Sequence, residues 1–134
     1  MIQPLLVFSD WGILILRVVL GIILIAHGLP KLKNLKGVAE GFGKMGFKPA
    51  RFWATFVGVL EFFGGLALIA GLFTQIIAFL IVIQFIVIIL KIKGKLGLVG
   101  GYEFDLLIFA AAFALLVFGA GNISLDTLWG IILY

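Results

Sequence analysis

The sequence contains no cysteine and only one histidine in its 134 residues. Without a thiol, the chain has no disulfide exchange, no thiolate nucleophile, no cysteine-ligated zinc and no iron–sulfur cluster of its own. It also lacks a dinucleotide-binding loop, because the Gly100-Gly101 pair lies between apolar segments and follows no strand. We therefore expect no metal site and no covalently bound cofactor, so that any electrons must come from a partner or a substrate.

Charged residues are scarce as well, at 12% of the chain against 64% hydrophobic residues. A soluble domain needs about a quarter of its residues charged to cover its surface. Several apolar runs of roughly 17 to 21 residues instead meet the length needed to cross about 30 Å of hydrocarbon. The composition predicts an all-α integral membrane protein that forms a single domain over residues 1–134.

Four apolar segments predict a bundle of four transmembrane helices. Between the second and third segments, Thr74 and Gln75 leave only a very short connection, so these two helices form a tight antiparallel hairpin. The four predicted spans cover residues 11–29, 52–72, 75–90 and 104–120.

Two shorter segments predict helices that lie on the membrane surface. In the loop after the first span, residues 37–47 place Val38 and Phe42 at a helical spacing, which favours an amphipathic interfacial helix. Residues 125–134 are too short to cross the bilayer. We expect Ser124 to cap a short helix there, with Trp129 and Tyr134 anchored at the interface.

Apart from Arg17 in the first span, the Lys and Arg residues lie in two loops, whereas the tails and the turn near Thr74 have none. Because both loops fall on one side of a four-span bundle, the positive-inside rule places them in the cytoplasm and both termini outside. We interpret the lysines as determinants of topology rather than a nucleic-acid or ligand patch, although those after the third span can also contact anionic lipid headgroups. The residues are Lys31, Lys33, Lys36, Lys44, Lys48 and Arg51 after the first span, and Lys91, Lys93 and Lys95 after the third.

Glu61 lies deep inside the second apolar segment, about 14 Å from its inner end at 1.5 Å of rise per residue. An ionisable carboxyl group at that depth costs a few kcal/mol at least unless other groups compensate for it. The alternative to a functional role is a protonated, purely structural Glu61. No lipid headgroup is within reach of Glu61, so the residues that contact its carboxyl group are the best indication of function.

Helical spacing turns several polar residues toward the interior. The first span carries a row of residues at alternating intervals of four and three, and the second span carries a similar row. Glycines in such rows let helix backbones approach closely, so we expect the two rows to face each other. The rows are Arg17, Gly21, Leu24, Gly28 and Lys31, and Ala54, Gly58, Glu61, Gly65 and Leu68.

Topology brings more polar groups to the inner side of Glu61. His27 lies at the inner end of the first span, while Glu103 and Asp105 begin the fourth. We expect His27, Glu61, Glu103 and, less firmly, Asp105 to line one cavity that opens toward the cytoplasmic half. Arg17 lies about 7 Å shallower than Glu61 and points outward, so a direct pair between them is possible without being required.

Each of these residues also has a structural interpretation. Arg17 can extend to the outer headgroups, and His27 can cap the end of its helix. Glu103 and Asp105 can be solvated residues at a helix N-terminus, favoured by the helix dipole, and for Asp105 we prefer that interpretation. Gln84, inside the third span, is expected to hydrogen-bond a neighbouring helix.

Several segments together resemble the DoxX family of small four-span membrane proteins. The similar segments are Arg17-Val-Val-Leu-Gly21, His27-Gly28-Leu-Pro-Lys31, Glu61-Phe-Phe-Gly64-Gly65, Gly100-Gly101-Tyr-Glu103-Phe-Asp105 and Gly119-Ala-Gly121-Asn-Ile-Ser124-Leu-Asp126. The resemblance implies a four-helix membrane bundle related to the DoxD-type subunit of thiosulfate:quinone oxidoreductase, although the additional regions of those longer chains are absent. It also marks Arg17, His27, Lys31, Glu61 and Glu103 as candidate functional residues.

Three functions fit these observations. The first is a quinone-interacting subunit of a membrane redox system, in which Glu61 and His27 relay protons, other polar residues bind the ligand, and a soluble or membrane subunit supplies electrons. The second is a module that binds a lipid or small amphiphile without chemistry. The third is an anchor for a partner protein, and a second copy of the chain is a further candidate partner. The ligand-binding candidates are Arg17, Lys31, Glu103 and Gln84.

Overall fold

The computed structural model describes residues 4–131. Within this range, four helices are long and apolar enough to cross a membrane, which confirms the predicted all-α four-span bundle. The spans extend beyond the predicted bounds in several places, because short helical turns continue α1, α4 and α5. They cover Pro4–Lys33, Ala50–Ala70, Thr74–Leu96 and Leu98–Phe118.

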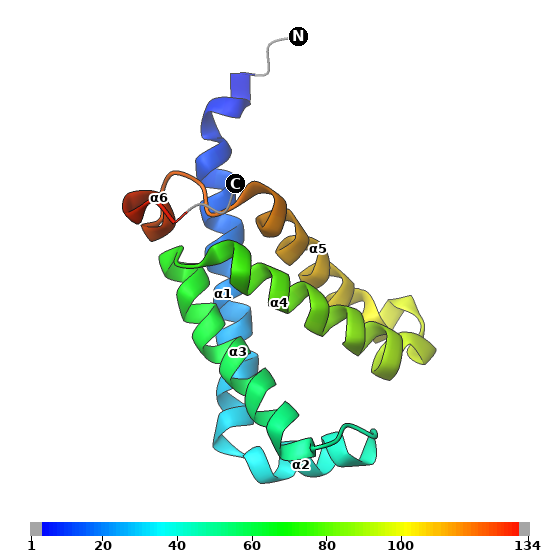
Figure 1. The fold of residues 1–134 in the computed structure, drawn as a ribbon. Coiled ribbons are helices and arrows are strands. Elements are labelled where there is room, and N and C mark those ends of the chain that lie inside the picture. Colours follow the sequence, from blue (N-terminus) through cyan, green and yellow to red (C-terminus); the bar gives the residue numbers. More distant parts are fainter. Residues whose placement is uncertain (1–3, 132–134) are drawn as a thin grey trace.

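The helices associate as two antiparallel pairs. α1 (Ser9–Lys33) packs along α3 (Ala50–Ala70), and α4 (Thr74–Val87) packs along α5 (Glu103–Phe118). The pairs meet near α6 (Leu125–Trp129) and diverge toward the opposite end of the bundle (Figure 1). This divergence leaves space between the pairs at the end that carries the two lysine-rich loops.

Glycines allow α1 and α3 to pack backbone against backbone. A Cβ atom added at Gly21 would lie 2.6 Å from the carbonyl oxygen of Gly65, and one added at Gly65 would lie 2.6 Å from that of Gly21. At Gly28 an added Cβ would lie 2.5 Å from the backbone nitrogen of Phe62. The predicted facing rows are thereby confirmed, and all their members are buried except the partly exposed Lys31.

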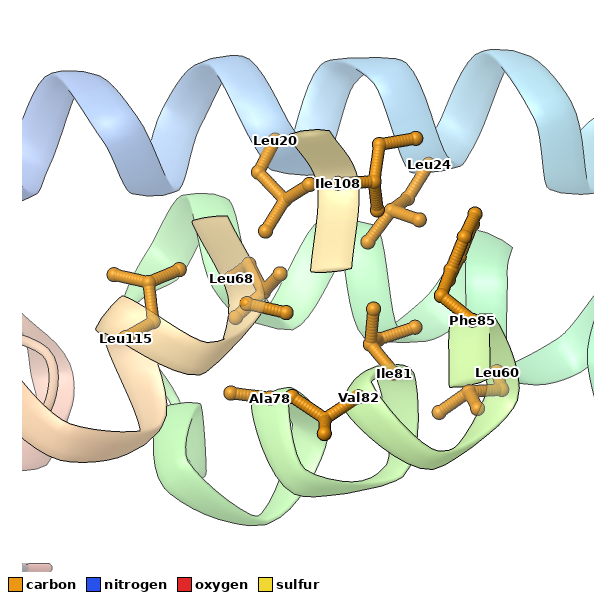
Figure 2. Packing of buried hydrophobic residues seen from close by; sticks show 11 residues of the cluster. Leu20, Leu24, Leu60, Leu68, Ala78, Ile81, Val82, Phe85, Ile108 and Leu115 are labelled. Carbon is orange, nitrogen blue, oxygen red and sulfur yellow. The ribbon is translucent and has the colours of Figure 1, made fainter. Parts of the chain in front are cut away.

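The hydrophobic core draws side chains from all four spans. Leu20 and Leu24 of α1 meet Leu68 of α3 and residues of α4 and α5 at the centre of the bundle (Figure 2). Because the lipid is as apolar as these side chains, close packing rather than release from water holds the spans together. The buried cluster comprises Leu20, Leu24, Leu60, Leu68, Ala78, Ile81, Val82, Phe85, Ile108, Ala112 and Leu115.

The hairpin between α3 and α4 turns earlier than the sequence predicted. Gly71 ends α3 in the left-handed region with φ 74°, and Thr74 is already the first residue of α4. The carboxylate of Asp126 accepts hydrogen bonds from the backbone N–H groups of Phe73, at 2.7 Å, and Thr74, at 2.9 Å. This cap starts α4 at Thr74, so that Thr74 and Gln75 belong to the helix and not to the connection.

Both short segments predicted to be helical contain a helix, over bounds that differ from the predicted ones by a few residues. α2 (Leu35–Lys44) occupies the first loop, where the side chain of Asn34 caps it by accepting a hydrogen bond from Gly37 N–H. In α6, Ser124 accepts from the N–H of Thr127, as expected, and the helix ends before Gly130. The expected anchor Tyr134 lies outside the described residues.

Candidate functional site

A cleft of about 790 Å³ separates the two helix pairs at the lysine-rich end of the bundle. Most of its lining is apolar and comes from the four spans, from the helical turn that follows α4, and from the end of α2 with the segment after it. A few polar side chains converge on it, as is usual for small-molecule sites. The polar members are His27, Lys31, Lys48, Glu61, Gln84, Lys91, Lys93 and Asp105.

Glu61 is the most deeply buried of these groups and is 1% exposed. The Nζ atom of Lys31 donates to both of its carboxylate oxygens, at 2.8 Å to Oε1 and 2.7 Å to Oε2. Gln84 Nε2 donates to Oε1 at 2.6 Å. Side chains from α1, α3 and α4 thus meet at one carboxylate, and the predicted interhelical hydrogen bond of Gln84 is confirmed.

The local packing explains how Lys31 reaches Glu61. An added Cβ at Gly28 would lie 2.9 Å from the Cβ atom of Glu61, so Glu61 stands level with Gly28. Lys31 follows about one turn later, and helix side chains point back toward the N-terminus of their own helix. The lysine stem therefore runs from the loop end of α1 toward the middle of the span, where its ammonium neutralises the buried carboxylate.

Gln84 leaves one polar atom free at the cleft. A carboxylate only accepts hydrogen bonds, so the amide must turn its NH₂ group toward Glu61. Its Oε1 atom is then buried and has no hydrogen-bond partner among residues 4–131. A buried acceptor without a partner is costly, which makes this atom a candidate contact for a ligand with a hydroxyl or N–H group.

The other wall of the cleft carries a second ion pair. Lys93 Nζ lies 3.0 Å from Oδ2 of Asp105, and Asp105 is 4% exposed. The expectation that Asp105 is a solvated helix-terminal residue is therefore wrong. The third span continues beyond α4 as a wide helical turn, η2 (Ile88–Lys93), which brings Lys93 to the first turn of α5.

His27 and Glu103 differ in their placement. His27 is exposed, lines the cleft and packs its ring 5.6 Å from that of Phe104. Glu103 is exposed outside the cleft lining and accepts a hydrogen bond from Gly100 N–H at 3.2 Å. The structure thus brings His27 and Asp105 to the cleft with Glu61 and leaves Glu103 out of it.

Arg17 lies near the opposite end of the bundle and does not reach Glu61. It is 1% exposed, and its guanidinium donates to the carbonyl oxygens of Ala120 and, at 2.8 Å, Ile123. Its side chain points away from the cleft, along the same N-terminal direction that carries Lys31 into it. Arg17 therefore neither pairs with Glu61 nor extends to the headgroups, but fastens the segment after α5 to α1.

Within the described range, no group of three or more His, Asp or Glu side chains is arranged to hold a metal ion. The lining of the cleft combines hydrogen-bonding and charged groups with an apolar setting, which suits an amphiphilic organic ligand.

Comparisons with known proteins point to one family. The sequence model of the DoxX family matches residues 12–94, a range that contains Lys31, Glu61 and Gln84. A protein of Bacillus subtilis (strain 168) named "Putative oxidoreductase CatD" is 34% identical over 115 residues, which cover 86% of this chain and 84% of that protein. No solved structure matches the chain.

Proposed function

The chain belongs to the DoxX family, and from this premise we propose that it is a quinone-interacting accessory subunit of a membrane redox system. The observation that carries the proposal is the cluster of Lys31, Glu61 and Gln84 at the wall of a mostly apolar cleft. The oxidoreductase name of the Bacillus relative agrees with it. The multi-pass membrane fold gives such a lipid-soluble ligand direct access from the bilayer.

The residues of the cleft fit a quinone chemically. A quinone headgroup needs hydrogen-bond donors for its carbonyl oxygens, and the reduced form needs an acceptor for its hydroxyl groups. The ammonium of Lys31 has three N–H donors, and its side chain remains 29% exposed. The unpartnered Oε1 atom of Gln84 supplies the acceptor. The apolar lining suits the ring and its tail.

When bound, a quinone would act as a two-electron carrier, which the chain's own residues do not provide. The electrons come from a reduced partner protein, soluble or membrane-bound. Lys31 passes a proton from Nζ to the ligand, and Glu61, whose Oε1 atom lies 2.8 Å from Nζ, then passes on to Lys31 a proton that it has first taken up from the lysine-rich end. Gln84 fixes the carboxylate by its hydrogen bond, so that the lysine keeps its position between Glu61 and the cleft.

Protons reach this cluster from the lysine-rich end, in the proposed arrangement. His27 is exposed at the cleft on the same helix as Lys31, and its imidazole is suited to shuttle protons. With the basic loops in the cytoplasm, as the positive-inside rule predicts, protons are taken from the cytoplasm. Both termini then lie outside.

The test asks whether quinone co-purifies with the protein and whether quinone turnover depends on Glu61. Wild type and Glu61→Gln are extracted from quinone-containing membranes, and bound quinone is quantified by absorbance and mass spectrometry. We expect wild type to retain quinone and Glu61→Gln to lose quinone turnover in native membrane vesicles, which also contain the partner that supplies the electrons. Glu40→Gln, the same change at an exposed carboxylate of α2, serves as the control and retains both.

Two results would contradict the proposal. A different amphiphile in the extract, with no quinone, would favour a non-catalytic binding module. Failure to find any retained ligand, together with activity that is equal in wild type, Glu61→Gln and Glu40→Gln, would exclude Glu61 from proton transfer and leave an anchoring role for the bundle.

A further inference from the structure

The mouth of the cleft carries positive charge that no described carboxylate balances. Four lysines and two carboxylates line the cleft, which leaves two excess positive charges with His27 neutral. Lys31 pairs with Glu61 and Lys93 pairs with Asp105. Lys48 and Lys91 form no ion pair with any described carboxylate, although both line the cleft. The excess charge therefore resides on these two residues.

Lys48 and Lys91 lie at the membrane-surface end of the cleft and come from different helix pairs. Lys48 stands just before α3, and Lys91 belongs to η2, which continues α4. Glu61 lies eleven residues into α3, about 16 Å from its start at 1.5 Å per residue. The cleft thus has an apolar interior, and its mouth carries two unpaired ammonium groups, of which the one on Lys48 lies about half a bilayer away from the buried carboxylate.

An aromatic residue at the mouth agrees with a position at the headgroup level. Trp53 lines the cleft and donates its indole N–H to the carbonyl oxygen of Lys48 at 3.3 Å. Tryptophan is enriched where the bilayer meets water, because its ring is apolar and its N–H is polar. The combination of tryptophan, unpaired lysines and an apolar groove matches a lipid with a negative headgroup.

We propose that the mouth of the cleft is a specific site for one anionic phospholipid. Lys48 and Lys91 bind its phosphate group from opposite walls, and one acyl chain follows the apolar lining inward. Charge complementarity selects an anionic over a zwitterionic headgroup, since only the former carries a net negative charge to offset the excess positive charge. Free phosphate would gain nothing from the apolar walls, and exposed lysines alone hold it weakly. This inference does not depend on the proposed quinone function.

The experiment compares two double variants that remove the same charge from the same two loops. Lys48→Gln/Lys91→Gln removes the two unpaired cleft lysines, whereas Lys36→Gln/Lys95→Gln removes two lysines that are also exposed but lie outside the cleft lining. Native mass spectrometry of the full chain in detergent is titrated with phosphatidylglycerol and with phosphatidylcholine. We expect wild type and the control to bind one phosphatidylglycerol preferentially, and the cleft variant to lose affinity for it on the order of tenfold or more.

Further comparisons in the same titration distinguish a specific lipid site from general attraction of anionic lipids to a basic surface. If both double variants lost equal affinity for phosphatidylglycerol, the effect would be a general attraction to a basic surface, and the proposal would be overturned. Unchanged binding by the cleft variant would also overturn it. Displacement of the lipid by inorganic phosphate at equal concentration would also overturn it. Glu61→Gln should bind phosphatidylglycerol like wild type, so that failure of the quinone proposal and failure of this one remain distinguishable.

Discussion

Lys31 Nζ lies 2.8 Å and 2.7 Å from the two carboxylate oxygens of Glu61, and this contact joins α1 to α3 deep in the bundle. The two partners differ in exposure, at 29% for the lysine side chain and 2% for the glutamate. Among residues 4–131, only Lys31 and Gln84 donate hydrogen bonds to this carboxylate, and all three residues line the cleft. A ligand in the cleft can therefore meet the more exposed Lys31 beside the buried Glu61.

Replacement of Lys31 by methionine should leave the Glu61 carboxylate without its counter-charge. Because the lysine is partly exposed, we expect a loss of about 1 to 3 kcal/mol in the free energy of unfolding, below the 3 to 5 kcal/mol typical of fully buried pairs. Lys33→Met, on the exposed side of the same turn, should change it by less than about 0.5 kcal/mol. Unfolding of the detergent-solubilised protein measures both values.

The double variant Lys31→Met/Glu61→Gln tests whether the two residues act as a pair. If they do, its loss is smaller than the sum of the two single losses, by about 0.5 to 3 kcal/mol. Strict additivity of the three measurements would show that the contact contributes no coupling energy.

The close approach of α1 and α3 gives a second prediction. Gly28→Ala places a Cβ atom where Phe62 N and the Cβ atom of Glu61 already lie, so the helices must separate. We expect a destabilisation of about 1 to 3 kcal/mol from overpacking, and weaker ligand retention in the cleft. Gly12→Ala is the matched control, since an added Cβ there meets nothing within 4 Å. Comparable losses in both variants would contradict the packing argument.

The sequence predicted the α1–α3 contact because that contact follows from helical spacing alone. Glycines at alternating intervals of three and four place the facing rows without knowledge of the rest of the fold. The depth of Glu61 likewise follows from counting residues. Helical spacing places Lys31 on the row that faces Glu61, and the family resemblance marks it as a candidate residue. Its contact with Glu61 then follows because a helix side chain points back toward the N-terminus of its own helix, as that of Arg17 does.

The second ion pair could not be predicted in the same way. Lys93 reaches Asp105 because the third span widens into the turn η2 after Val87. Apolar periodicity does not encode where an α-helix changes its hydrogen-bond register. Asp126 poses a similar problem, since its contacts with Phe73 and Thr74 depend on where the segment after α5 folds back.

The cap formed by Asp126 provides the third prediction. Asp126→Ala removes the acceptor for the Phe73 and Thr74 N–H groups, and we expect a loss of about 1 to 2 kcal/mol. Hydrogen exchange at these two amides should become faster, while exchange in the middle of α3 changes less. Asp10→Ala removes a carboxylate that accepts from Asn122 at an exposed site, and its effect should be smaller. Unchanged exchange at Thr74 in the Asp126 variant would refute the cap.

Arg17 offers the fourth prediction, which separates structural from ligand-binding residues. Its guanidinium donates to the carbonyl oxygens of Ala120 and Ile123 at once, a fork that a single ammonium group reproduces poorly. We expect Arg17→Lys to lower the free energy of unfolding by about 1 to 3 kcal/mol, because buried acceptors lose a charged donor. Ligand retention, normalised to folded protein, should stay at the wild-type level, because Arg17 lies outside the cleft lining. For Lys31→Met we expect the opposite result. The fraction of retained ligand that is lost should exceed the fraction of folded protein that is lost. If Arg17→Lys removed the ligand while the protein stayed as stable as wild type, Arg17 would belong to the binding site after all.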